Sequence, residues 1–413
     1  MFEKLFVRPA AITRYKQAPY AKEREAYLAH CTQEGYAIAT LMETASTLVL
    51  VVRELGAFRD RPITLAQVKA AATRWLKKDP KPSRSLRRRY EHFVRTATQW
   101  LRFLGRLCVP VGKPVPFAGL LDDFTTWMAA ERGLSSATIR QREWHLRKFL
   151  SWYGKRRQPL AEVKVQDVDS FLTACGARGC GRGTLRITAA ALRAFFRYAA
   201  RRGECPASLS EAIEGPCVFR QETLPAGPAW DEVRRLVASF GSDRPCDVRN
   251  RALVLLLATY GLRAGEVCAL RLEDLDWGKR RILVRRSKQR GSQVYPLAPT
   301  VGDAIERYIK TTRPVCPFQE LFVTLRAPRR PITRGVIGQV ISQRLQKLGI
   351  ETLHHGPHAL RHACAGHLVT NGFSLKEIGD HLGHRSPQST AIYAKVDLPG
   401  LREVAAFDLG GLL

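Results

Sequence analysis

The feature that most constrains the fold is a repeat within the first half of the chain. Residues 34–41 (EGYAIATL) align with residues 132–139 (RGLSSATI) at an offset of 98 residues. Apolar residues further along keep this offset: Leu48, Val51 and Val52 in the first copy and Leu146, Phe149 and Leu150 in the second. Each copy is typical of a helix, a glycine-containing turn and an amphipathic helix. We predict a duplicated helical module, the alternative being two unrelated amphipathic helices that share a common turn.

Proline-rich segments divide the rest of the chain. Residues 109–116 (VPVGKPVP) and residues 215–228 hold too many prolines to continue a helix, because proline lacks the backbone N–H and clashes with the preceding turn. The length of 413 residues is also too great for one typical domain. We therefore predict three domains, which are residues 1–106, residues 114–218 and residues 222–413.

The pattern changes after the second proline-rich segment. Residues 229–240 and 247–260 have helical spacing, whereas residues 281–286 and 293–297 are rich in Val and Ile and predict a hairpin turned by Gly291 and Ser292. Helical patterns return from Pro299 onward. The predicted fold class is mainly α with a small antiparallel β-sheet in the C-terminal domain, preceded by all-helical bundle modules.

The charge balance narrows the class of partner. Lys and Arg number 67 against 37 Asp and Glu, a formal net charge of +30, which favours a polyanion. The positive charge is concentrated in three runs, Arg74–Arg106, Arg178–Arg202 and Lys279–Arg290. One such run is usually a solvated face, but three with little compensating acid favour DNA or RNA binding. Heparin binding remains an alternative on charge alone.

Other patterns bear on the cellular setting. No run of eighteen apolar residues is present, and the basic runs lack an apolar face for a membrane surface, so we expect no membrane partner. The first residues lack a signal-peptide layout, and the ten cysteines have irregular spacing, which favours reduced thiols. We expect a cytoplasmic protein.

Candidate catalytic residues are found in separate boxes of the C-terminal domain. Arg263 lies in a Gly-Leu-Arg-x-x-Glu box, and His358 and Arg361 lie in a His-x-x-Arg-His box. His384 closes a Leu-Gly-His box, and Tyr393 follows it by nine residues. This set resembles the tyrosine recombinases, the phage-integrase family, over roughly Pro116 to the end of the chain. The family also has a lysine in a hairpin turn eight residues before a proline, and Lys288 precedes Pro296 by eight.

The resemblance implies a reaction whose demands these residues meet. Phosphodiester cleavage needs a nucleophile, a proton for the leaving oxygen and cations on the phosphate. Tyr393 is the expected nucleophile, Arg263 and Arg361 can bind phosphate oxygens through their planar guanidinium groups, and Lys288 is the expected general acid. His358 and His384 are expected at the same phosphate. The implied product is a 3′-phosphotyrosine link that conserves the bond energy, so we expect no cofactor and no metal.

Two points complicate these assignments. The family's lysine is usually flanked by glycines, whereas Ser287 and Gln289 flank Lys288, and several arginines lie nearby. The histidine-rich stretch around His358 could indicate zinc, but no Glu follows His358 as it would in a metalloprotease helix. We interpret His362 as a packing residue and Glu266 as a residue that orients an arginine or caps a helix.

The resemblance also implies partners and domain roles. Residues 222–413 would be the catalytic domain, residues 114–218 a core-binding DNA module, and residues 1–106 a duplicate that lengthens the DNA footprint or holds protomers together. We expect double-stranded DNA with an inverted-repeat core site, a homo-oligomer that is a tetramer on DNA, accessory or sister recombinases, and a nucleoid-associated location. The expected role is integration or excision of a mobile element.

The C-terminal tail is expected to dock on a neighbouring protomer, the alternative being that it packs on its own domain. Its apolar residues are Leu398, Leu401, Val404, Phe407 and Leu409. Alternative functions are a type IB topoisomerase, a hairpin telomere resolvase and a non-catalytic sequence-specific DNA-binding protein. The short interval between His384 and Tyr393 and the core-binding module favour the recombinase over the topoisomerase and the resolvase. The presence of every catalytic residue type argues against the non-catalytic protein.

Overall fold

The computed structural model describes residues 1–56, 61–78, 86–108, 115–219, 227–286, 291–384, 386–396 and 400–402. The chain divides into two compact units, Val109–Glu222 on one hand and Met1–Cys108 with Thr223–Leu413 on the other. In the unit made of Met1–Cys108 and Thr223–Leu413, the N-terminal residues and the C-terminal residues bury separate hydrophobic cores. The division into three domains stays a prediction.

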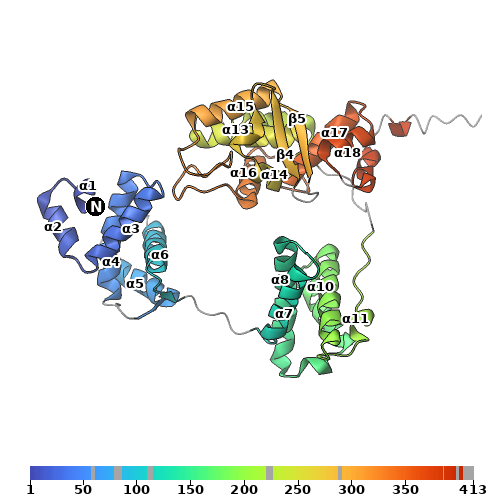
Figure 1. Cartoon of the computed structure of the whole chain (residues 1–413), viewed down its shortest axis with the longest axis horizontal. Coiled ribbons are helices and arrows are strands. Elements are labelled where there is room, and N and C mark those ends of the chain that lie inside the picture. The colour runs from blue at the N-terminus through green and yellow to red at the C-terminus, as the bar shows by residue number, and fades with distance from the viewer. Residues whose placement is uncertain are drawn as a thin grey trace, which may run out of the picture. The chain divides into compact units, whose positions relative to one another are not determined.

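The N-terminal residues form a helical module in which α4 and α6 are the longest helices (Figure 1). Its helices are α1 (Phe2–Leu5), α2 (Pro9–Gln17), α3 (Ala21–Gln33), α4 (Ile38–Leu55), α5 (Leu65–Lys77) and α6 (Leu86–Phe103). The prediction of an all-helical first half is wrong in one detail, because β1 (Ile63–Thr64) pairs in parallel with β2 (Leu107–Cys108). The chain returns to the same place after α4 and after α6, where the backbone N–H of Ile63 donates to the Arg106 carbonyl.

The second module is a helical bundle around an aromatic core that includes Phe124, Phe149, Phe171 and Phe195. Its helices are α7 (Ala118–Ala130), α8 (Ser136–Tyr153), α9 (Val165–Ala177), α10 (Arg182–Arg201) and α11 (Leu209–Ala212), with 3-10 turns η1 (Gly154–Arg156) and η2 (Leu160–Glu162). Helix α10 is the longest helix of this module, with 20 residues.

The C-terminal domain packs helices around a small sheet and provides the frame for the site. Its helices are α12 (Trp230–Ala238), α13 (Pro245–Tyr260), α14 (Ala264–Ala269), α15 (Pro299–Thr311), α16 (Arg334–Lys347), α17 (Pro357–Thr370) and α18 (Leu375–Leu382). Short 3-10 turns are η3 (Leu272–Asp274), η4 (Pro387–Ser389) and η5 (Ala391–Val396). Helix α13 is buried along most of its length and contacts α15 and α17, so it forms the centre of this domain.

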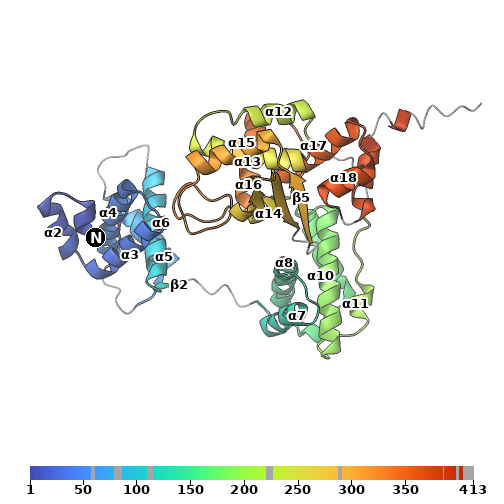
Figure 2. The same ribbon diagram turned by 45° about the horizontal axis from the view of Figure 1, so that its top comes forward.

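The sheet has three antiparallel strands in the order β3 (Leu275–Asp276), β4 (Arg281–Arg286) and β5 (Gly291–Pro296). Strand β5 lies beside α18 (Figures 1 and 2). The prediction of a hairpin is confirmed, but the predicted turn is wrong. Gly291 pairs with Arg286 and Ser292 with Arg285, so both residues belong to β5.

Candidate active site

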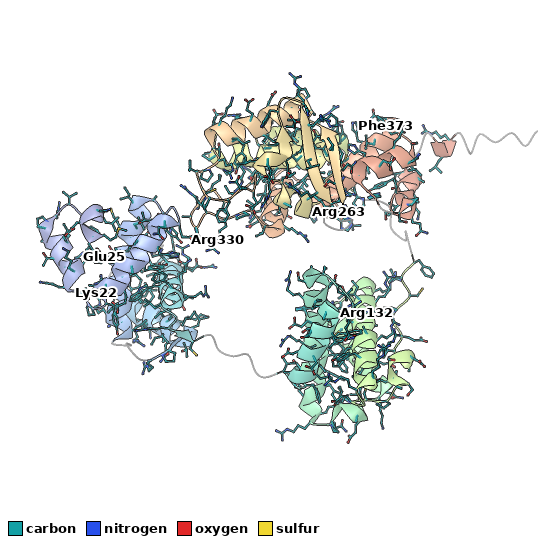
Figure 3. All side chains as sticks on the ribbon, in the orientation of Figure 1. Lys22, Glu25, Arg132, Arg263, Arg330 and Phe373 are labelled. Atoms are coloured by element: carbon teal, nitrogen blue, oxygen red, sulfur yellow. The ribbon has the colours of Figure 1, made fainter. Side chains whose placement is uncertain are left out.

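Arg263 is positioned by the tight connection between α13 and α14. Helix α13 ends at Gly261, whose φ of 57° is a left-handed conformation that favours glycine, and a Cβ there would lie 2.3 Å from Cδ2 of Leu382. The chain then turns into α14, with Arg263 as its N-cap residue. The Arg263 side chain remains partly exposed and is labelled in Figure 3.

Arg361 connects two distant chain segments from within the domain. This residue lies on α17 and is only 2% exposed. Nη1 donates to the Gly261 carbonyl at 2.6 Å, and Nη2 donates to the Leu382 carbonyl at 2.8 Å. Burial lowers the pKa of Arg361 to about 10, and the charge of Arg263 acts in the same direction. Arg361 therefore holds the segment before Arg263 and the segment before His384 against α17.

His384 directly follows the end of α18. Gly383 ends that helix with a left-handed φ of 63°, and the His384 backbone N–H donates to the Gly379 carbonyl at 2.8 Å. Nδ1 of the ring lies 2.7 Å from Oγ1 of the buried Thr390, which leaves Nε2 as the nitrogen that can face a phosphate. Burial lowers the pKa of His384 to about 4, with further lowering from Arg361 and Arg263.

Tyr393 lies on η5, a 3-10 helix that packs on α17, and it is 2% exposed. Its hydroxyl lies 3.0 Å from Nδ1 of His362. Burial raises the pKa of Tyr393 to about 12, although the charge of Arg361 opposes that rise. Burial likewise lowers the pKa of His362 to about 4, so this imidazole is neutral at pH 7. A neutral imidazole nitrogen can accept the proton of a tyrosine hydroxyl.

Glu266 orients Arg263 and also pairs with a second arginine. One carboxylate oxygen accepts from Nη1 of Arg263 at 2.9 Å, and the other accepts from the Arg263 backbone N–H at 2.8 Å. The latter oxygen also accepts from Nη1 of Arg286 at 2.7 Å, and the side chains of Glu266 and Arg286 are both 2% exposed. The two roles expected for Glu266, helix capping and orientation of an arginine, are both present.

Arg286 joins the β-hairpin to the C-terminal end of α18. It donates to Oε1 of Gln293 and to the hydroxyl of Tyr295, and Tyr295 in turn donates to the His381 carbonyl. Nε2 of Gln293 donates to the Asp380 carbonyl at 2.8 Å. A Cβ at Gly383 would lie 2.7 Å from the Arg286 guanidinium, so this close approach requires glycine. The hairpin thus begins from a fixed base beside His384.

The predicted residues are not all placed equally. The structure brings four of them together: Arg263 at the start of α14, Arg361 on α17, His384 after the end of α18 and Tyr393 on η5. Each of the four either shifts the pKa of another member or has its own pKa shifted by one. His358 is exposed on the first turn of α17, and its ring centroid lies 4.7 Å from that of His362. Lys288 lies outside the described residues, as does most of the tail from residue 397.

Sequence reasoning missed two residues of this site. His362 was interpreted as a packing residue, yet it is hydrogen-bonded to Tyr393. Its place as the final histidine of the His-x-x-Arg-His box was the sequence pattern that could have identified His362 as a site residue. No sequence spacing predicts the pairing of Arg286 with Glu266, because the two residues are twenty positions apart in the chain. Within the described ranges, no group of three His, Cys, Asp or Glu side chains is arranged to hold a metal ion.

The arrangement suits anion chemistry at an aromatic hydroxyl. Two guanidinium groups and an imidazole N–H offer preorganised donors for a phosphoryl group, whose charge increases in the transition state. The hydroxyl of Tyr393 is a group that can act as an oxygen nucleophile, and it lies next to an acceptor for its proton. The site therefore has the components of a phosphoryl-transfer centre with a tyrosine nucleophile.

Comparison with known proteins defines the class. The Phage integrase family matches residues 229–398, and the "Phage integrase, N-terminal SAM-like domain" family matches residues 121–203. The chain is 36% identical to the putative integrase/recombinase y4rA of Sinorhizobium fredii over 66% of this chain and 67% of that protein. It is 30% identical to the tyrosine recombinase XerA of Pyrococcus horikoshii over 69% of this chain and 91% of that protein.

A solved structure shares the fold. The Tn1549 transposon integrase in complex with transposon right end DNA matches 70% of this chain and 99% of that chain, with a TM-score of 0.53 and 20% identity. The family models and the sequence relatives establish that the chain belongs to the phage integrase family. It is a tyrosine-type site-specific DNA recombinase. No helix in the described part of the chain is long and apolar enough to cross a membrane.

Proposed function

We propose that this protein cuts and rejoins double-stranded DNA through a covalent 3′-phosphotyrosine at Tyr393. The observation that supports this most strongly is the pair of hydrogen bonds from Arg361 to the carbonyls of Gly261 and Leu382. These bonds bring the segments that carry Arg263 and His384 to the helix on which Tyr393 packs. A structural role alone would not require two arginines, an imidazole and a buried tyrosine at one place.

Each residue takes a distinct role in the proposed reaction. Arg263 and Arg361 bind the non-bridging oxygens of the scissile phosphate, and Nε2 of His384 donates a hydrogen bond to the same group. Each such donor is typically worth about 3 kcal/mol in a transition state. His358, exposed at the start of α17, contacts the same phosphate once DNA is bound. Lys288 protonates the leaving 5′ oxygen as general acid.

The nucleophile is activated through His362. The hydroxyl of Tyr393 donates its proton to Nδ1 of the neutral His362 as the oxygen attacks phosphorus, and the bond to the 5′ oxygen breaks. Attack by a 5′ hydroxyl of a second strand reverses the step and regenerates the tyrosine. Because Tyr393 is almost fully buried, η5 must shift from its position on α17 before the hydroxyl reaches a phosphate.

The biological role that fits best is integration or excision of a mobile genetic element. The relatives include a putative integrase/recombinase, and the structural neighbour is a transposon integrase bound to transposon-end DNA. We infer a duplex substrate with an inverted-repeat core site, because two copies of a recombinase on such a site are related by its symmetry. A tetramer would join two sites, accessory or sister recombinases would assist, and the setting would be the nucleoid in the cytoplasm.

The tail from residue 396 is proposed to dock on a neighbouring protomer. Truncation after Lys395 should then abolish assembly on DNA while the remaining domain still binds a single core site. Retained assembly would show that the tail packs on its own domain.

The decisive experiment is a suicide-substrate assay. Nicked duplexes tiled from the DNA that flanks the gene are incubated with the full chain, and protein–DNA adducts resistant to SDS are measured for the native chain and Tyr393→Phe. An adduct that requires Tyr393 supports the proposal and identifies the site. Equal adducts with both proteins would exclude Tyr393 as the nucleophile. Tight binding without any adduct would favour the non-catalytic DNA-binding protein.

A further inference from the structure

The N-terminal module has the same succession of helices as the second module. Helices α3, α4 and α5 have the lengths of α7, α8 and α9, namely 13, 18 and 13 residues, and α6 has 18 residues against 20 in α10. Helix α4 starts and ends 98 residues before α8. Helices α3 and α7 also each begin after an N-cap residue in the left-handed conformation, Tyr20 at φ 59° and Phe117 at φ 60°.

The loops and the core follow the same correspondence. Gly35 and Gly133, and likewise Gly105 and Gly203, are pairs at the offset of 98 residues, and all four have positive φ. Both modules also have a threonine–histidine contact between their two longest helices. Thr47 on α4 lies 3.2 Å from the His92 ring on α6, whereas His145 on α8, the equivalent of Thr47, lies 2.8 Å from Thr188 on α10. The first module therefore repeats the helix order and helix lengths of the second module, which the SAM-like family matches.

The two copies differ on the exposed face of their first 18-residue helix. On α8 this face carries cations and a tryptophan that is 51% exposed, and a groove runs alongside it. The equivalent positions on α4 carry no cation. The aligned residues are Arg140, Gln141, Trp144, Arg147 and Lys148 on α8 and Met42, Glu43, Ser46, Val49 and Leu50 on α4.

Part of the α4 face is also occupied by the protein itself. The hydroxyl of Tyr15, on α2, lies 2.7 Å from Oγ of Ser46, the position equivalent to Trp144, and α1 contacts α4. The buried Arg24 fastens α2 by donating to the carbonyls of Tyr15 and Ala18. In the second module only residues 109–117 separate β2 from α7, too few for two such helices. The exposed cations and the tryptophan of the α8 face are therefore absent from the equivalent face of α4.

Helix α6 nevertheless keeps a basic stripe. Arg88, Arg95 and Arg102 are exposed and follow one another at seven-residue intervals, which places them along one side of the helix over roughly 21 Å. Two of them are equivalent, at the same offset, to Arg186 and Arg193 of α10. Glu91, the one acidic residue of α6, pairs with Arg87 at 2.8 Å. Within the described residues none of the three stripe arginines has a carboxylate within 4 Å, although Arg95 also contacts His92 at 3.1 Å.

We propose that the N-terminal module binds duplex DNA by its phosphate backbone through Arg88, Arg95 and Arg102, and reads no base sequence. The stripe matches the length of roughly six base pairs at 3.4 Å each. Phosphate contacts of this kind position a protein on DNA, whereas base contacts in the grooves specify sequence. The module thus adds affinity outside the core site. This inference rests on the proposed function only in taking DNA as the partner.

The test is the salt dependence of DNA binding by the full chain. The affinity for a 40-base-pair duplex of arbitrary sequence is measured against salt concentration for the native chain and for Arg88→Gln/Arg95→Gln/Arg102→Gln. The slope of log K against log salt is negative, and each lost phosphate contact reduces its magnitude by about 0.9, so we expect a decrease of about 2 to 3 in that magnitude. The same decrease is expected on a second duplex of unrelated sequence.

Matched variants separate the stripe from net charge and from misfolding. Lys4→Gln/Lys22→Gln/Lys69→Gln removes the same charge from exposed sites of the same module and should leave the slope within about one contact of the native value (Lys22 is labelled in Figure 3). Replacement of the three stripe arginines by Lys keeps the charges and should restore the slope. An equal decrease in both glutamine variants would overturn the proposal. A decrease confined to one of the two duplex sequences would also overturn it.

Two further outcomes are distinguishable. The stripe variant should still form the Tyr393 adduct on a nicked core duplex, because it leaves the catalytic domain intact. If the native chain forms no adduct while the stripe still controls the salt slope, the catalytic proposal fails and the present inference stands. If the stripe variant loses self-association and keeps the native slope, the module is a protein-docking surface and the inference is wrong.

Discussion

Replacement of Glu266 by glutamine tests the central ion cluster of the site. Its carboxylate is the one acidic partner within 4 Å that the described residues provide for the buried Arg286, and it also fixes Arg263 through two hydrogen bonds. Glu266→Gln keeps the size and one acceptor oxygen of the side chain. It removes the negative charge, so the Arg286 guanidinium remains buried without a counterion.

The expected cost follows from that burial. Removal of one partner of a buried ion pair typically destabilises a protein by about 3–5 kcal/mol, because the remaining charge is uncompensated. Arg286 keeps its bonds to Gln293 and Tyr295, which places the expectation at the lower end, about 3 kcal/mol. For a domain of this size that corresponds to a decrease in melting temperature of roughly 6–12 °C.

The assay is urea unfolding of the full chain, followed by a probe in the C-terminal domain, together with the rate of adduct formation on a nicked duplex. Glu273→Gln is the matched control, because Glu273 pairs with Arg271 and Arg285 at the surface with its side chain 60% exposed. Exposed pairs contribute about 0–1 kcal/mol. If Glu266→Gln costs no more than Glu273→Gln, the reasoning about the buried cluster is refuted.

The same cluster predicts a pH dependence. Burial alone would raise the pKa of Glu266, but the backbone N–H of Arg263 and the charge of Arg286 outweigh it and lower the pKa below the usual value. The contribution of Glu266 to stability is therefore complete above the pKa of an unfolded glutamate, about 4.3, and is lost as the pH falls through the lowered folded value. Glu266→Gln should remove that acid-side loss. An unchanged acid transition in the variant would contradict this assignment.

Three more predictions concern other residues of the C-terminal domain. Gly383→Ala should destabilise the chain by at least about 1–2 kcal/mol in denaturant, since φ is 63° and a Cβ would meet Arg286, whereas Gly366→Ala on α17, with no atom close to its Cβ, should not. Burial lowers the pKa values of His362 and His384 to about 4, so the stability of the chain should fall as the pH drops from about 6.5, where unfolded histidine binds protons, towards 4. The double variant His362→Asn/His384→Asn should flatten this dependence of stability on pH. An equally steep dependence in the variant would exclude these two residues as its cause. Lys288→Ala should slow cleavage by about 10²- to 10⁴-fold on an ordinary duplex but not on one with a 5′-bridging sulfur, which needs no acid to leave, and equal slowing on both would reject the general-acid role.

The sequence was sufficient for the features that depend on local patterns. Apolar spacing identified α12 and α13 to within a few residues, and the order and spacing of the boxes identified the recombinase family. The prediction of a turn from glycine was wrong in the hairpin. Gly291 was assigned to the turn, but it pairs with Arg286 in the sheet. Strand register depends on which side chains the neighbouring helix accepts, and here Arg286 and Tyr295 point towards α18.

Only the tertiary structure decided how the site is held together. Arg263 and Glu266 are three residues apart on one helical turn, so their contact could be expected from the sequence. By contrast, Arg361 reaches the carbonyl of Gly261 across one hundred residues, and Tyr393 reaches His362 across thirty-one. Such contacts depend on how helices pack after they have formed, and an isolated spacing carries no information about that packing. The sequence alone therefore predicted most of the candidate catalytic groups, whereas packing of the buried side chains determined which residues lie against them and hold them in place.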